Sequence, residues 1–355
     1  MIKEHRTSPP KVTGTGSISP LASFKHNPKI QDTWDGKEPF FIPKDYLWIR
    51  GLDEESRNKR KEPNMKLTSE NLLELATLAE KTAMQAGEFI AENSKGDVVV
   101  QSKNGGDTLA SCVVTKIDIR SQEIILDALG PTLARFDLGL LSEESPDDSS
   151  RFEKNYFWAI DPLDGTLPFT EGRHGYAVSI ALVSCAGVPV VGVVYDPVRS
   201  KCYKAVSGQG VWVDGTRFAP VTSSKSSKLT LIFDRSFLNH ERYPEMQEKL
   251  QSFAREHYSA EVEVIAFGGA VMNALWVLER SPACYFKFPK KSDGGGSIWD
   301  YSATACIFVE AGGFASDIYG NPLDLNRADS TFLNHRGVVF ASDKRLSEFI
   351  KELTF

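Results

Sequence analysis

Two aspartates end an apolar run in the stretch YFWAIDPLDGT, and their spacing indicates metal chemistry. The bulky residues from Tyr156 to Ile160 predict a buried strand, whose carboxyl edge would present Asp161 and Asp164 together. Carboxylates held this close repel each other, and they stay ionised only beside a cation or with compensating hydrogen bonds. Their hard oxygen atoms suit Mg²⁺ or Mn²⁺. An isolated DxxDG is also typical of a turn between two strands, so the other motifs must decide.

The residues that flank these aspartates could receive an anion. Pro162 stiffens the turn, and Gly165 leaves room for a substrate oxygen to approach the backbone N–H groups of Gly165 and Thr166. We therefore expect both amides to contact the substrate.

A third aspartate precedes this stretch. The pattern after Thr115 predicts a helix that ends at Gly130 and Pro131, with Asp118 in its first turn. Thr115 and Asp118 have the spacing of a capping box, so capping is the structural alternative to a catalytic role for Asp118.

Two further segments place acidic residues at the ends of predicted elements. An apolar strand leads into Glu143 and Glu144, although an EESPDD run on its own is typical of a solvated loop. The segment GGGS at 294–297 is interpreted as a flexible connector, because it lacks the GK[ST] of a phosphate-binding P-loop. It precedes a helix that Trp299 and Asp300 open.

Composition and charge exclude several classes of function. The chain has 355 residues, of which 41% are hydrophobic and 25% charged, as in ordinary globular proteins. The net charge of -6 and the lack of a dense basic block argue against a nucleic acid partner. No apolar run is long enough to predict a membrane span. The 5 cysteines are scattered without a CxxC pair, which suits a reducing compartment, and the 6 histidines lack zinc-ligand spacing.

The pattern predicts an N-terminal extension and one large domain of mixed α/β structure. Residues 1–66 show no steady period and are expected to be partly flexible, with an aromatic patch at 46–49. Residues 67–355 form the domain, with an α+β half at 67–220 and an α/β half at 221–355. Period-two segments after the central stretch predict an antiparallel meander with a DG turn at Asp214 and Gly215, and strands then alternate with helices.

Taken together, the motifs resemble one family. Glu143 and Glu144, the DPLDGT at 161–166, the VTKID at 114–118, and WDYSA followed by EAGG are similar in order and spacing to the inositol monophosphatase superfamily. Its members are metal-dependent, lithium-sensitive phosphatases. The resemblance covers the chain from about Leu67 onward and implies a layered αβαβα sandwich of the sugar-phosphatase type.

The resemblance also implies roles for single residues. Two or three Mg²⁺ ions, with Mn²⁺ as a substitute, would be held by acidic side chains and one backbone carbonyl, from Glu143, Asp161, Leu163 (carbonyl), Asp164 and Asp300. Asp118 and Thr166 would orient the attacking water, and Glu144 would support the ligands. Substrate would contact Gly165, Thr166, Gly269, Asn273 and Lys287. Clustered metal ions suit a phosphate monoester because they neutralise its oxygens and activate water.

The substrate is less sharply indicated. Inositol-cleaving relatives carry an acidic residue where this chain has Lys287, and a lysine offers donors and positive charge instead. Together with the FLN at 332–334, this favours a bisphosphorylated nucleotide, 3′-phosphoadenosine 5′-phosphate, over inositol monophosphate. Against it, Asn273 stands where such nucleotidases tend to have lysine, and Lys287 is also typical of a solvated loop.

One alternative function and three wider expectations remain. A non-catalytic protein that binds a phosphorylated metabolite and regulates a partner is the function of another class. The partner expected for an enzyme is a small phosphorylated metabolite, and a homodimer that buries the patch at 46–49 would match relatives. The cytoplasm is the predicted compartment, although the basic, acid-poor first thirty or so residues leave organelle import open.

Overall fold

The computed structural model describes residues 66–94, 100–102, 113–219 and 228–353. All of them belong to one compact unit, Lys44–Phe355. The expected N-terminal extension, apart from its last residue, and the aromatic patch at 46–49 lie outside the described residues.

A seven-stranded sheet carries the central stretch. Its strand order is β3-β4-β5-β6-β7-β8-β9. The bounds are β3 Gly139–Ser142, β4 Tyr156–Asp164, β5 Ala177–Ser184, β6 Pro189–Asp196, β7 Lys201–Val206, β8 Gly210–Val213 and β9 Thr216–Arg217. Only the β3–β4 pair is parallel, with Ser142 opposite Ile160, and the remaining pairs form the predicted antiparallel meander. The DG turn joins β8 to β9 as predicted, with positive φ at both Asp214 and Gly215.

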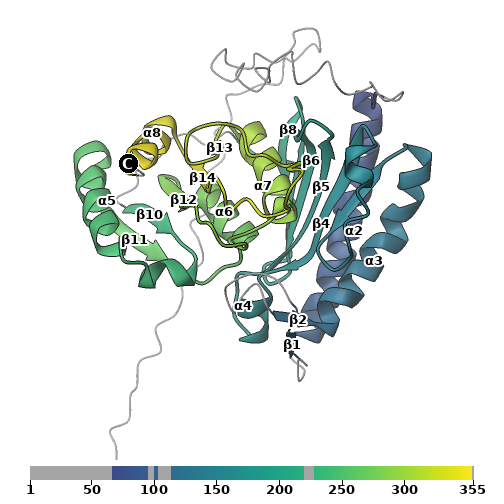
Figure 1. Ribbon diagram of the computed structural model, residues 1–355, viewed down its shortest axis with the longest axis horizontal. Coiled ribbons are helices and arrows are strands. Elements are labelled where there is room, and N and C mark those ends of the chain that lie inside the picture. Colours follow the sequence, from purple (N-terminus) through teal and green to yellow (C-terminus); the bar gives the residue numbers. More distant parts are fainter. Residues whose placement is uncertain (1–65, 95–99, 103–112, 220–227, 354–355) are drawn as a thin grey trace, which may run out of the picture. The chain divides into compact units, whose positions relative to one another are not determined.

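Two long helices, α2 (Ser69–Asn93) and α3 (Lys116–Arg135), cover one face of this sheet (Figure 1). Thr68 caps α2 through a capping box with Asn71. The predicted end of α3 at Gly130 and Pro131 is wrong, because the helix continues through Pro131 to Arg135. Trp158 of β4 donates to the Thr132 hydroxyl at 2.9 Å, so buried contacts beyond the proline outweigh its local cost.

A five-stranded sheet forms the second half of the described chain. Its order is β11-β10-β12-β14-β13, in which β10 is parallel to both β11 and β12, and β14 is antiparallel to both of its neighbours. The bounds are β10 Lys228–Ile232, β11 Glu261–Ile265, β12 Ala283–Lys287, β13 Phe314–Ser316 and β14 Val338–Ala341. The helices that alternate with these strands are α5 Tyr243–Tyr258, α6 Ala270–Glu279, α7 Ile298–Ala311 and α8 Lys344–Glu352.

The layers follow from which helix packs on which sheet. Helices α6 and α7 lie between the two sheets, and α5 and α8 cover the outer face of the five-stranded sheet (Figure 1). With α2 and α3 on the outer face of the seven-stranded sheet, the order is α, β, α, β, α. The predicted αβαβα sandwich is therefore confirmed.

Five smaller elements complete the described chain, among them the short 3-10 helices η3 (Ser150–Phe152) and η4 (Arg235–Asn239). Strands β1 (Val100–Ser102) and β2 (Val113–Thr115) pair antiparallel, and α4 (Thr166–Thr170) is a single short helix. None of the helices described has the length and apolar character that crossing a bilayer requires.

A close approach of α7 to the sheet gives the first prediction. A Cβ added at Gly192 of β6 would lie 2.4 Å from the Ala303 carbonyl oxygen and 2.8 Å from the Cys306 Cβ. Gly192→Ala should therefore force α7 outward and lower the free energy of unfolding by about 1–3 kcal/mol, measured by urea denaturation.

Gly130→Ala is the matched control, because a Cβ there meets nothing within 4 Å. The gain in helix propensity is offset by the restriction on a residue before proline, so we expect a change within about 0.5 kcal/mol. Equal effects of the two substitutions would contradict the packing argument.

Candidate functional site

Asp161 and Asp164 emerge where β4 departs from regular pairing. Asp161 lies opposite Ser179 and Asp164 opposite Ala177, so the register with β5 shifts between them. Pro162 has no N–H to donate to a neighbouring strand, which favours an irregularity at this point. The Leu163 amide instead donates to Asp161 Oδ1 at 2.9 Å, and this bond fixes one aspartate oxygen.

Asp300 joins the two aspartates from α7, the helix that packs on the inner face of the seven-stranded sheet. Ser297 caps α7, and its amide donates to Asp300 Oδ2 at 2.5 Å in a capping box. One carboxylate oxygen of each of Asp161, Asp164 and Asp300 lies within 4.8 Å of the others, and all three side chains are buried. The structure thus brings together three of the four side chains expected to hold metal.

The electrostatics of this cluster demand a positive charge. Burial raises the pKa of Asp161 well above its usual value, and the charges of Glu143, Asp300 and Asp164 raise it further. Burial and Asp300 raise the pKa of Asp164 in the same direction. Asp161 Oδ2 is buried and has no hydrogen-bond partner among the described residues. A hard divalent cation fits this donor set, because it would neutralise the carboxylate charges and give Asp161 Oδ2 a partner.

Asp164 also bonds to the first turn of α6. Its Oδ1 accepts from the Ala270 amide at 3.0 Å and its Oδ2 from the Val271 amide at 2.9 Å. These amides lower the pKa of Asp164 and offset part of the burial cost. A Cβ at Gly269 would lie 2.3 Å from Asp164 Oδ2, so this approach requires glycine. Gly269 therefore lies against Asp164, and its contact with a substrate stays a prediction.

The proposed water-orienting pair is in hydrogen-bond contact. Thr166 Oγ1 lies 2.9 Å from Asp118 Oδ1 and 3.3 Å from the Leu163 carbonyl oxygen, and both side chains are buried. Asp118 lies in the first turn of α3, where a capping role was the alternative. The side chain of Thr115 lies outside the described residues, so that alternative stays untested.

Glu143 and Glu144 follow β3 directly and are partly buried. The Glu143 amide donates to the Ile160 carbonyl at 3.1 Å, which keeps this segment beside β4. The charge of Glu143 raises the pKa of both Asp161 and Asp164, but Glu143 is not one of the three carboxylates whose oxygens lie within 4.8 Å of one another, and its role as a metal ligand stays a prediction.

Lys287 is paired rather than solvated. It ends β12, its side chain is 16% exposed, and its ammonium lies 2.6 Å from Asp234 Oδ2 and donates to the Gly295 carbonyl at 2.8 Å. Burial opposes the charge, but Asp234 raises the pKa of Lys287 above its usual value. The solvated-loop interpretation is therefore wrong, and the charge assigned to Lys287 is balanced by a carboxylate. Asp234 was not singled out from the sequence; in the parallel β10–β12 pair Ile232 lies opposite Tyr285, and Asp234 and Lys287 each follow two residues later.

Asn273 packs inside α6. It is fully buried and donates to the Gly268 carbonyl at 3.1 Å, and its Oδ1 has no hydrogen-bond partner among the described residues. The Asn273 side chain therefore bonds to the segment just before α6, which contains Gly268 and Gly269, and it is not part of the acidic cluster.

The segment GGGS at 294–297 is a fixed turn, so its interpretation as a flexible connector is wrong. Its three glycines have φ between 81° and 112°. The Gly295 carbonyl also accepts from the Tyr301 hydroxyl at 3.0 Å, and the Gly296 carbonyl accepts from the Leu333 amide at 3.0 Å. These bonds hold the turn that leads into α7 and Asp300.

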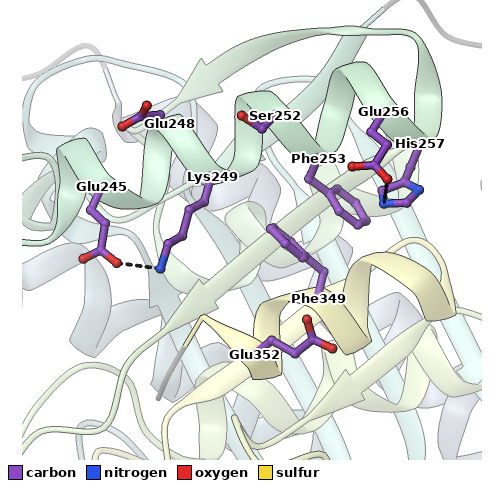
Figure 2. Close-up of a pocket in the computed structure, with 9 residues that line it drawn as sticks. All are labelled: Glu245, Glu248, Lys249, Ser252, Phe253, Glu256, His257, Phe349 and Glu352. Carbon is purple, nitrogen blue, oxygen red and sulfur yellow. Dashed lines mark hydrogen bonds and ion pairs between the residues drawn. The ribbon is translucent and has the colours of Figure 1, made fainter.

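A surface hollow between α5 and α8 is separate from these residues (Figure 2). Phe253 and Phe349 stack there at 4.1 Å, and Glu245 pairs with Lys249 at 2.6 Å. None of the candidate site residues lines this hollow.

Comparison with known proteins decides the family. The model of the inositol monophosphatase family matches residues 71–354. The chain belongs to the inositol monophosphatase family. Metal-dependent phosphatases make up this family, so the predicted class of enzyme is confirmed.

Individual relatives differ in their names. The chain is 24% identical over 274 residues to an inositol-1-monophosphatase of Bacillus subtilis, covering 76% of this chain and 92% of the relative. It is 31% identical over 258 residues to the 3′(2′),5′-bisphosphate nucleotidase CysQ of Shigella flexneri, covering 71% and 94%. The solved structure of an inositol monophosphatase from Anabaena has a TM-score of 0.58 at 23% identity, covering 80% and 96%, and shows the same fold.

The crowded carboxylates give a prediction about stability. With a chelator present at pH 7, Asp161→Asn should raise the free energy of unfolding by roughly 1–2 kcal/mol, because it removes a buried, repelled charge. The amide can keep the Leu163 bond and donate from the former Oδ2 position. The gain should shrink as pH falls, because the raised pKa of the wild-type Asp161 lets it take up a proton and lose the same charge.

Thermal melting in chelator at pH 7 and pH 5 measures both effects. The exposed Asp127→Asn in α3 serves as the control and should change stability by less than about 0.5 kcal/mol. A destabilising effect of Asp161→Asn in chelator would show that the cluster is not under repulsion.

Proposed function

We propose that this protein is a Mg²⁺-dependent phosphomonoesterase that acts on a small phosphorylated metabolite. The observation that carries the proposal is the buried group of Asp161, Asp164 and Asp300, in which Asp161 Oδ2 has no hydrogen-bond partner among the described residues and the pKa values of Asp161 and Asp164 are raised. Glu143 and the Leu163 carbonyl complete the proposed ligand set. Bound there, the ions would neutralise phosphate oxygens and lower the pKa of a bound water.

The protein's own groups would do the rest. The Thr166 hydroxyl donates to Asp118, which leaves its oxygen lone pairs able to accept from an attacking water and so to orient it. The amides of Gly165 and Thr166 would receive the phosphate, and such donors gain value as charge shifts in the transition state. Glu144 would support Glu143 from the neighbouring position.

We favour a 3′(2′),5′-bisphosphate nucleotide, 3′-phosphoadenosine 5′-phosphate, as the substrate. The support is the 31% identity to a CysQ nucleotidase over 94% of its length, against 24% to the inositol-1-monophosphatase. Lys287 also supports this substrate, because its ammonium could donate hydrogen bonds to a second phosphate where a carboxylate could not. The ammonium is paired with Asp234, so it would meet that phosphate as part of an ion pair.

One observation favours inositol monophosphate as the second candidate. Asp234 lies beside Lys287 and could accept hydrogen bonds from sugar hydroxyls, the role expected of an acidic residue at position 287. Homodimer formation and a cytoplasmic location stay predictions.

Phosphate release by the purified protein tests the reaction and the substrate. We expect hydrolysis with Mg²⁺, loss of activity with EDTA, and a higher kcat/KM for 3′-phosphoadenosine 5′-phosphate than for inositol 1-phosphate. Asp161→Asn is the matched inactive variant. The absence of phosphate release from both compounds at saturating Mg²⁺ would favour the non-catalytic, metabolite-binding alternative.

Lys287 tests the substrate preference separately. Lys287→Glu should lower kcat/KM for the bisphosphate about tenfold or more relative to inositol 1-phosphate, because it replaces a cation with an anion near the substrate. Lys287→Met controls for the loss of the Asp234 pair without adding a charge. If both variants leave the ratio of the two substrates unchanged, Lys287 does not select the substrate.

A further inference from the structure

Side chains on one face of α3 donate and accept hydrogen bonds with two of the backbone segments that carry candidate metal ligands. Asp118, Ser121 and Gln122 lie at positions i, i+3 and i+4 and therefore share a helix face, and all three are buried. Asp118 contacts Thr166, as described above. The other two were not singled out by the motifs, although their spacing from Asp118 places them toward the same site.

Gln122 brackets Glu143 with hydrogen bonds. Its Oε1 accepts from the Ser142 hydroxyl at 2.5 Å and from the Glu144 amide at 3.1 Å. Its Nε2 donates to the Ser145 hydroxyl at 2.9 Å. The amide group thus bonds to the residue before Glu143 and to the two residues after it.

Ser121 holds the other ligand-bearing segment. Its hydroxyl is fully buried and donates to the Pro162 carbonyl at 2.8 Å, between Asp161 and Leu163. This bond fixes the peptide plane that leads into Leu163, whose own carbonyl is a proposed ligand. One turn of α3 is therefore bonded to both segments that supply ligands from the seven-stranded sheet.

The hydrogen bonds of Ser121 and Gln122 oppose the repulsion between the clustered carboxylates. One oxygen of each of Asp161, Asp164 and Asp300 lies within 4.8 Å of the others, so without a cation these carboxylates repel each other and favour conformations that move apart. If only a fraction of the molecules holds the ligands together, the apparent dissociation constant of the metal rises by the inverse of that fraction.

We propose that Gln122 and Ser121 are positioning residues that set the Mg²⁺ affinity of the site. They act by keeping Glu143 and the Asp161–Asp164 segment in place before the ion arrives, without contacting it. The proposal rests on the proposed metal-dependent function and adds to it the residues that preorganise the ligands.

Titration calorimetry with MgCl₂ on the full-length protein tests this. Gln122→Met keeps the length of the side chain and removes its hydrogen bonds, and we expect the Mg²⁺ dissociation constant to rise about 10- to 100-fold. Ser121→Ala is the milder variant, suited to a helix interior, and should raise it by roughly threefold or more. The KM for substrate at saturating Mg²⁺ should stay within about twofold of wild type.

Glu123→Gln is the control, because Glu123 is exposed on the same helix and pairs with Arg120 at 2.7 Å. It should leave Mg²⁺ binding unchanged. Melting temperatures in EDTA separate the proposed role from a structural one, since a purely structural role lowers them without changing the dissociation constant. Dissociation constants for Ser121→Ala and Gln122→Met within twofold of wild type would overturn the proposal. If the wild-type protein itself binds no Mg²⁺, the proposed function fails instead.

Discussion

Mutual repulsion among buried carboxylates is the constraint on which the rest of this structure depends. Asp161 and Asp164 lie in strand β4 and Asp300 lies in helix α7, yet one oxygen of each lies within 4.8 Å of the others. Such an arrangement is unstable unless something external compensates for the charge. The surrounding fold supplies part of the compensation through the amides of Ala270 and Val271. The negative charge that these amides leave uncompensated explains why a divalent cation suits the site.

Residues that could be assigned from sequence share a simple geometric rule. Asp161 and Asp164 end a buried strand, Glu143 follows its parallel neighbour, and Asp300 lies in the first turn of a helix. Strand ends and helix starts are recognisable from local patterns, and they are also where α/β folds place ligands. The layered architecture followed from the same periodicities, so most of the fold was within reach of the sequence.

What the sequence did not reveal depends on contacts between distant segments. Pro131 predicted a helix end, but packing of Thr132 against Trp158 carries α3 onward. The glycines at 294–296 indicated flexibility, yet Lys287, Tyr301 and Leu333 donate hydrogen bonds to the carbonyls of the last two. Local propensity cannot register such bonds, because the partners are far apart along the chain or belong to different elements.

The hydrogen bonds from α6 to Asp164 connect the expected substrate contact with the expected metal binding. The glycine at position 269 and the first turn of α6 lie next to the expected substrate, and the same turn fixes both oxygens of an expected ligand. A substitution there that adapts the enzyme to a new metabolite would also shift Asp164. During divergence within this lineage, substrate range and ion affinity are therefore not free to change independently.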